Sequence, residues 1–276
     1  MTNRLLTPMS RAARRPMSRA ARRPMSRAAR RSLRAGMLPG LVACAAAVYA
    51  AGALWAHDLL FALSACAGFG LMAALVVPGA VRHHPHARFG AANQVTLARG
   101  TGTALLAGLI AAPDVLGTHA AAVWLPFAGA AALLLLDLCD GALARRQGLA
   151  SAFGARFDQE VDAAAILVLS ALAVAIADAP WWTLGIGALH YLYRLGGWLI
   201  PALARPLPYS LRRRIVCGVQ IAALGALLAP PTPAGWSAVL TTVALVALTL
   251  SFLRDGLWSL TRGAAFTPAR RPGAGA

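Results

Sequence analysis

Residues 137–162 read DLCDGALARRQGLASAFGARFDQEVD, and this stretch decides the fold. It holds five of the nine acidic residues in the chain and lies between two long apolar segments. A carboxylate close to hydrocarbon is costly and marks a functional site by default. Asp137 and Asp140 are three residues apart, and Asp158 and Asp162 are four apart, so each pair can share one helix face. The stretch predicts four carboxylates that converge from two consecutive helices.

The chemistry of this cluster follows from its ligand atoms. Several carboxylates at one depth need a cation to neutralise them, and hard oxygen ligands suit Mg²⁺ or Mn²⁺. Four carboxylates can hold two ions about 3.5–4 Å apart. The 17 residues 141–157 predict a short connection, which makes the two helices antiparallel neighbours. Within it, Gly141 and Gly154 let a substrate approach the backbone, and Arg145 can bind phosphate oxygens with its guanidinium fork.

The composition of the chain is that of a membrane protein. Hydrophobic residues make up 59% and charged residues 13% of its 276 residues, and the mean hydropathy is +0.63. A soluble domain carries about twice that charged fraction, so an ordinary water-soluble protein is excluded. A membrane-spanning helix needs roughly 20 apolar residues. Eight segments meet or approach this length: 35–56, 59–81, 93–112, 115–136, 158–177, 181–203, 215–229 and 234–253, the seventh extending back toward Leu211.

The basic residues predict the orientation of these segments. All 26 are arginine, and loops rich in basic residues stay in the cytoplasm. If the N-terminal arm is inside, every arginine except Arg194 lies in an inner segment or at the start of the third helix. The inner segments are then 1–34, 82–92, 137–157, 204–214 and 254–276. We therefore expect a multi-pass protein of the bacterial cytoplasmic (inner) membrane with both termini in the cytoplasm.

The N-terminal arm, residues 1–34, carries 11 arginines and three tandem copies of PMSRAARR. It has few large apolar residues and no acids, so we expect disorder there, as in the tail 256–276. Three interpretations stay open: a tail that faces anionic lipid headgroups, an initiation site assigned too early, and a transit peptide. No aromatic residue is interleaved to stack on bases, so no nucleic-acid partner is expected.

The decisive stretch follows the pattern D-x2-D-G-x2-A-R-x8-G-x3-D-x3-D. That pattern resembles the signature of the CDP-alcohol phosphatidyltransferase family, and every specified position matches. Upstream, Asn93, Thr96 and Arg99 form N-x-x-T-x-x-R, which is similar to the start of the family's first core helix. The resemblance covers residues 90–255. It implies an all-α, polytopic membrane helix bundle, in which two extra N-terminal transmembrane helices within 35–89 precede a six-helix core.

The resemblance implies an enzyme of phospholipid biosynthesis. Family members transfer a phosphatidyl group from CDP-diacylglycerol to a small alcohol and release CMP, and some transfer a phospho-headgroup from a CDP-alcohol to diacylglycerol. It also implies two Mg²⁺ or Mn²⁺ ions and Asp162 as the candidate general base. The implied metal ligands are Asp137, Asp140, Asp158 and Asp162, and the implied CDP-binding residues are Gly141, Ala144, Arg145 and Gly154.

Glycerol 3-phosphate is the acceptor we predict, because it is a common bacterial acceptor in the family and arginines are plentiful near the site. Arg194, deep in the apolar run HYLYRLGGW, either is paired internally or snorkels, or else contacts an acceptor phosphate. Arg99 is a second candidate acceptor contact, with a snorkelling arginine at an interfacial helix start as the alternative. Arg205 and Arg212–Arg214 favour lipid headgroups and topology, and acceptor binding is their minor alternative.

Other functions stay open. Intramembrane carboxylates also mark transporters and proton pathways, although such groups tend to lie near the midplane and these lie at one face. A membrane scaffold that uses the arginine arm is a third class. Glu160 lies outside the family pattern, and His83, His84 and His86 predict a solvated loop. The two extra helices, 35–89, are candidates for a packing element or a homodimer surface.

Overall fold

The computed structural model describes seven stretches of the chain, and they are built from helices. These are residues 27–54, 59–117, 120–147, 149, 151–204, 210–230 and 235–261, with the side chains of 52, 54, 139–147 and 211 outside the description. Within these stretches there are eight α-helices and no strand, which confirms the predicted all-α bundle. The helices are α1 (Arg27–Leu54), α2 (Leu59–His83), α3 (Ala91–Ala111), α4 (Leu125–Gln147), α5 (Ala152–Ile176), α6 (Leu184–Leu199), α7 (Leu211–Leu227) and α8 (Trp236–Thr261). Three short 3-10 helices are η3 (Pro113–Gly117), η4 (Ala122–Trp124) and η5 (Trp181–Thr183).

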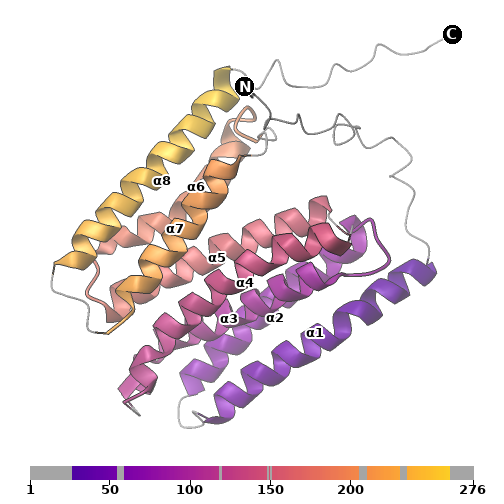
Figure 1. Cartoon of the computed structure of the whole chain (residues 1–276), viewed down its shortest axis with the longest axis horizontal. Helices are drawn as coiled ribbons and strands as arrows, with labels where there is room; N and C mark the ends of the chain where they lie inside the picture. The colour runs from indigo at the N-terminus through magenta and orange to yellow at the C-terminus, as the bar shows by residue number, and fades with distance from the viewer. Residues whose placement is uncertain are drawn as a thin grey trace, which may run out of the picture.

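Helix α3 lies at the centre of the bundle. It packs extensively against α2, α4 and α5, and it also contacts α1. In Figure 1, α1 to α5 run side by side, while α6, α7 and α8 form a second group. Helix α5 joins the two groups, because it packs against α3 on one side and against α6 and α7 on the other.

Helices α4 and α5 touch each other only slightly, and α3 packs against both. The two aspartate-bearing helices are joined by a short connection, but each packs mainly against α3 rather than against the other. A short connection fixes the ends of two helices together, but it does not decide which third helix packs along them. The carboxylates of α4 and α5 therefore face a site that α3 also borders.

Small and hydroxylated residues make the central position of α3 possible. A Cβ atom at Gly102 would lie 3.1 Å from Leu133 Cδ2 of α4, and one at Gly108 would lie 2.8 Å from Phe61 Cδ2 of α2. The hydroxyls of Thr101 and Thr103 donate to carbonyl oxygens one turn earlier, at 3.0 and 2.9 Å. Since these hydroxyls are satisfied within the helix, α3 is polar in sequence and still buried by its neighbours.

Helix α4 differs most from its predicted segment, 115–136. It begins ten residues later, because the chain first forms two 3-10 helices between Pro113 and Trp124. It then continues to Gln147, and α5 begins at Ala152, so the connection is much shorter than the predicted 141–157. Alanine, arginine and glutamine are good helix formers. The charged residues from Asp137 onward end the apolar run of the sequence, but the helix α4 continues through them.

Helix α1 differs in the opposite direction, because it starts earlier than predicted. It begins at Arg27 rather than at 35, so the end of the segment expected to be disordered is helical. Leu33 of this extension is buried with Met37 and Phe89, which gives the helix an apolar partner at that level. Residues 1–26 and 262–276, where the rest of the expected arm and most of the expected tail lie, fall outside the described residues.

Among the residues that the structure describes, four helices, α1, α2, α5 and α8, are long and apolar enough by themselves to cross a membrane. This supports a membrane bundle, although eight spans were predicted. The difference has a physical reason: α6 and α7 have only 16 and 17 residues, and α3 carries polar residues that its neighbours bury. Across η4 and α4 the apolar stretch, Ala122–Leu138, is too short for a span. On α1 and α2, large apolar side chains such as Tyr49, Leu59 and Leu75 are exposed, as expected for a surface in contact with lipid.

Candidate active site

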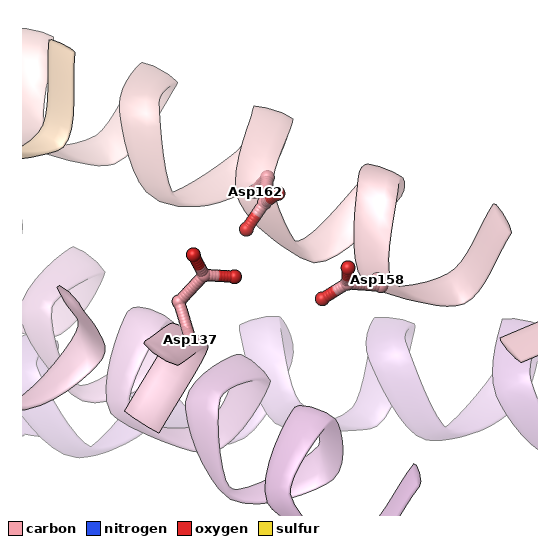
Figure 2. Close-up of side chains that lie close together, drawn as sticks. All are labelled: Asp137, Asp158 and Asp162. Carbon is pink, nitrogen blue, oxygen red and sulfur yellow. The ribbon is translucent and has the colours of Figure 1, made fainter. Parts of the chain in front are cut away.

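Three aspartate side chains meet between α4 and α5. Asp137 lies on α4, and Asp158 and Asp162 lie one turn apart on α5. One carboxylate oxygen of each lies within 4.8 Å of the other two. Figure 2 shows the three carboxylates turned toward one another across the space between the two helices. The structure thus brings together three of the four predicted metal ligands.

Arg99 of α3 lies in the middle of these carboxylates. Its Nη1 is 3.2 Å from Asp137 Oδ1 and 2.7 Å from Asp158 Oδ1, and its Nη2 donates to Asp162 Oδ1. The Arg99 side chain is only 1% exposed. Arg99 therefore does not snorkel to the surface, which was the simpler of its two sequence interpretations. A contact from Arg99 to the acceptor stays a prediction.

The first turn of α5 is held against α3 at a close approach. Ser151 caps α5 by accepting a hydrogen bond from the Gly154 backbone N–H at 3.0 Å. A Cβ atom at Gly154 would lie 2.9 Å from Asn93 Oδ1, so only glycine fits beside this buried amide. Asn93, Thr96 and Arg99 recur at three-residue intervals on α3 and are all buried. The N-x-x-T-x-x-R pattern therefore marks the stripe of α3 that contacts α5.

A buried histidine packs beneath the same turn. His84 is 2% exposed, accepts a hydrogen bond at Nε2 from Asn93 Nδ2 at 3.1 Å, and lies 5.6 Å from the Phe153 ring between centroids. The prediction of a solvated histidine loop is thus wrong for His84. Spacing alone could not show this, because Phe89 and Phe153 come from different parts of the chain. Burial lowers the pKa of His84 from its usual value of 6.5, since an apolar setting disfavours the imidazolium.

Helix α7 borders the other side of the cluster. Arg214 Nη2 donates to the Asp137 backbone carbonyl at 3.3 Å, and the Cys217 thiol interacts with the Asp162 carboxylate. The sequence interpretation favoured a topological role for Arg214. That interpretation stays a prediction, and the place of Arg214 beside Asp137 also puts a guanidinium at the edge of the site, which no spacing in the sequence indicated.

Arg194 of α6 pairs with Glu160 of α5 at the surface. The two side chains are 56% and 44% exposed, and Arg194 Nη1 donates to Glu160 Oε1. This is the internally paired alternative for Arg194. Its role in acceptor binding stays a prediction, because an exposed pair can open to a ligand.

Four predicted site residues are only partly described. The backbone of α4 continues through Asp140, Gly141, Ala144 and Arg145, but their side chains lie outside the described residues. Asp140 as a metal ligand and the other three as CDP-binding residues therefore stay predictions. The same holds for Arg205, which lies in an undescribed stretch.

The comparison with known protein families decides the identity of the chain. The family model described as CDP-alcohol phosphatidyltransferase matches residues 89–252, more than half of the chain. The chain belongs to the CDP-alcohol phosphatidyltransferase family. This confirms the resemblance drawn from the eight motif positions. Searches of curated proteins and of solved structures gave no significant match.

Family membership and the apolar helices together make this an integral membrane protein and a phosphotransferase of phospholipid biosynthesis in general terms. A CDP-alcohol phosphatidyltransferase typically uses a divalent metal. The residues present fit such an ion: they offer three hard carboxylate oxygens within 4.8 Å. Among the described side chains, three carboxylates face the one guanidinium of Arg99, and this excess of carboxylates suits a divalent cation.

Proposed function

We propose that this protein transfers a phosphatidyl group from CDP-diacylglycerol to a small alcohol, with glycerol 3-phosphate as the preferred acceptor, and releases CMP. The observation that carries the proposal is the convergence of Asp137, Asp158 and Asp162 from two helices, in a chain that belongs to the CDP-alcohol phosphatidyltransferase family. An excess of buried negative charge of this kind suits a site that handles metal-bound pyrophosphate.

Asp162 is the proposed general base. In this scheme its carboxylate accepts the proton of the acceptor hydroxyl, and the acceptor oxygen forms a bond to the phosphorus that carries diacylglycerol. The bond from that phosphorus to the bridging oxygen breaks, and CMP leaves with the bond electrons. Asp162 is largely buried, with 19% of its side chain exposed. Such shielding from water favours transfer to the alcohol over hydrolysis.

The aspartates are the proposed metal ligands. Asp137 and Asp158, with Asp140 and Asp162, would hold one or two Mg²⁺ or Mn²⁺ ions. When bound, the ions would neutralise the pyrophosphate charge and the charge that develops on the leaving phosphate. Gly154 with Gly141, Ala144 and Arg145 of α4 are the proposed residues of the CDP pocket.

The acceptor is proposed to be acidic because guanidinium groups border the carboxylates. Arg214 lies beside Asp137, and Arg194 lies on the face of α6 that meets α5. A phosphate-bearing acceptor would gain charge-assisted hydrogen bonds from such groups. A neutral acceptor such as inositol would gain less, and a cationic acceptor such as choline or ethanolamine would be repelled by these guanidiniums.

The orientation is also part of the proposal. We propose that the aspartate site faces the cytoplasm, where CDP-linked lipid and a water-soluble acceptor can meet, and that the protein lies in a bacterial inner membrane. The separation of the arginines into alternate loops of the sequence supports this. Helices α1 and α2 remain candidates for a homodimer surface.

The experiment is a CMP-release assay on the purified full-length protein with CDP-diacylglycerol and Mg²⁺ or Mn²⁺. The acceptor panel is glycerol 3-phosphate, serine, inositol phosphate, choline and ethanolamine. We expect CMP only with metal present, and most CMP with glycerol 3-phosphate. Absence of CMP with every acceptor, together with solute or proton flux in liposomes, would replace the enzyme by the transporter alternative.

A further inference from the structure

Arg99 takes the place among the carboxylates where a cation is needed, and the proposed reaction gives it no step. We propose that Arg99 acts as a resident counter-cation: it competes with the divalent metal for Asp137, Asp158 and Asp162 and so lowers the metal affinity of the site. The proposal rests on the metal requirement of the proposed function. It also predicts that the metal-free protein depends on Arg99 for stability.

The contacts show that Arg99 and a metal ion would use the same groups. Nη1 of Arg99 contacts Oδ1 of both Asp137 and Asp158, and Nη2 contacts Oδ1 of Asp162. These are the three side chains that could jointly ligate an ion. A guanidinium and a divalent cation on the same carboxylates repel each other, and at this burial the repulsion is weakly screened. Metal binding and the Arg99 pairing therefore oppose one another.

A contrary effect needs weighing, because Arg99 also gathers the carboxylates and could preorganise them for metal. The packing decides between the two effects. Helix α3 packs extensively against both α4 and α5 independently of the guanidinium, through close contacts such as Gly102 with Leu133 and Gly154 with Asn93. The helices that carry the aspartates therefore keep their places without Arg99. Removing the guanidinium then mainly removes positive charge, which strengthens metal binding.

This gives a signature that a purely structural arginine lacks. Without Arg99, three carboxylates repel one another and the metal-free protein melts at a lower temperature. A divalent ion relieves this repulsion. The variant without Arg99 should therefore bind metal more tightly than the wild type, and metal should raise its melting temperature by more than it raises that of the wild type. A purely structural arginine would, on removal, lower stability and metal affinity together.

The test measures Mn²⁺ binding by electron paramagnetic resonance on full-length protein in detergent, which counts free Mn²⁺ without any turnover. The variants are Arg99→Met, Arg99→Gln and Arg99→Lys. We expect Met and Gln, which remove the charge, to tighten Mn²⁺ binding roughly tenfold, a typical size for coupling between two bound groups. Lys keeps the charge and should stay close to wild type. The melting temperature without metal should fall in the two neutral variants.

The matched control is Arg212→Met. Arg212 also forms a partly buried ion pair between helices, with Asp255 of α8 at 2.6 Å, but it lies outside the carboxylate cluster. Its loss should lower the melting temperature and leave Mn²⁺ affinity unchanged. If neither neutral Arg99 variant folds without metal, recovery of the folded protein by excess Mn²⁺ during solubilisation supports the proposal, and failure to recover it counts against it.

The outcomes separate this proposal from the function. Neutral variants that bind Mn²⁺ no more tightly than wild type overturn the role of Arg99, while CMP release by the wild type leaves the enzyme assignment intact. A wild-type protein that binds no Mn²⁺ and still releases CMP overturns the metal assignment and the Arg99 proposal with it.

Discussion

Two groups of buried and partly buried charged side chains tie helices of this bundle together, and they differ in their balance of charge. In the first, Arg99 of α3 meets three aspartates of α4 and α5. In the second, Asp255 of α8 meets Arg212 at 2.6 Å and Arg213 at 3.6 Å, both from α7. Among the described side chains, carboxylates outnumber guanidiniums in the first group, and guanidiniums outnumber carboxylates in the second. Both lie at helix–helix contacts, so position alone does not tell them apart.

The difference suggests what distinguishes a candidate metal site from ion pairs that only hold helices together. The distinguishing feature is an excess of carboxylates, and not the burial of the ion pairs. Buried charges are costly unless they are compensated. The α7–α8 group compensates its carboxylate with two guanidiniums, and Arg212 also donates a hydrogen bond to the Ser251 hydroxyl. The aspartate group is incomplete within the described residues, and a divalent ion is the partner that would complete it.

The comparison is tested by the same change, aspartate to asparagine, made once in each group. Asp162→Asn removes the proposed base and a metal ligand, so we expect CMP release to fall by at least about 10³-fold. Asp255→Asn removes the carboxylate charge that Arg212 and Arg213 both contact, so we expect the free energy of unfolding to fall by about 1–3 kcal/mol. CMP release by Asp255→Asn should stay at the wild-type rate. The measurements are the CMP assay and the melting temperature in detergent.

Asp114→Asn controls for the replacement of an aspartate by asparagine as such, because Asp114 lies exposed in η3 and outside both groups. It should leave both measurements unaffected. Retained activity in Asp162→Asn, or a collapse of activity in Asp255→Asn with the fold intact, would show that the charge comparison misplaces the chemistry.

A smaller loss of activity is expected from Gly154→Ala, which changes only the packing next to the aspartate group. The new methyl group would lie 2.9 Å from Asn93 Oδ1 and 3.3 Å from Ser151 Oγ. Asn93 cannot retreat freely, since it is buried and donates to the Phe89 carbonyl. The start of α5 must shift and carry Asp158 with it. We expect a 10- to 100-fold loss of CMP release, roughly the effect of a 1 Å misplacement.

The double variant Asn93→Ala with Gly154→Ala removes the opposing side chain and should recover part of the lost CMP release. Gly218→Ala in α7 is the matched control, because a Cβ atom there meets nothing within 4 Å. It should leave activity unchanged. Loss of activity in Gly154→Ala that persists undiminished in the double variant would point to a contact with CDP rather than to helix packing.

The sequence predicted the parts of this site that depend on local spacing. The i,i+4 pair Asp158 and Asp162 had to share a face of one helix, and the structure has them there. The helix count also followed from sequence, because an apolar run of about 20 residues is a strong local signal. The start of α7 at Leu211 was predicted for the same reason.

What the sequence could not predict depends on tertiary packing. Arg99 sits some 60 positions from Asp158, and only the packing of α3 along α5 brings them together. The burial of His84 likewise requires Phe153 from a distant helix. The end of α4 was misplaced for a different reason: a polar residue stops an apolar run, while helix hydrogen bonds continue through it. The spacing Asn93, Thr96, Arg99 was the one available signal for the α3 stripe.

The exposed pair of Arg194 and Glu160 is a third case for the comparison of the charged groups, because it has one guanidinium and one carboxylate. Exposed pairs contribute at most about 1 kcal/mol, so Arg194→Gln and Glu160→Gln should both leave the melting temperature nearly unchanged. If Arg194 contacts an acceptor phosphate, Arg194→Gln should raise the KM for glycerol 3-phosphate roughly tenfold, the loss of one charge-assisted hydrogen bond. Steady-state CMP release against acceptor concentration measures this.

Glu160→Gln is the matched partner in that experiment. It breaks the same pair but frees Arg194 for the acceptor, so the KM should stay equal or fall. A rise in KM of equal size in both variants would assign Arg194 to holding α6 against α5, and would leave the acceptor site elsewhere.

The smallest expected effect is a pH dependence on the aspartate side of the bundle. Burial lowers the pKa of His84 below 6.5, so the unfolded chain binds a proton at a higher pH than the folded protein does. The stability that neutral His84 contributes is therefore complete above pH 6.5 and declines as the pH falls from 6.5 toward the lowered pKa. Melting temperature measured between about pH 5 and 8 should show this decline.

His84→Gln should flatten that decline, because glutamine keeps a hydrogen-bonding group beside Asn93 but does not titrate. His83→Gln is the control: His83 is the adjacent residue and is exposed at the end of α2, so its loss should leave the wild-type slope. An unchanged slope in His84→Gln would move the titrating group elsewhere. Since His84 packs on Phe153 at the start of α5, a flattened slope would tie acid sensitivity to the helix that carries Asp158 and Asp162, and not to the α7–α8 link.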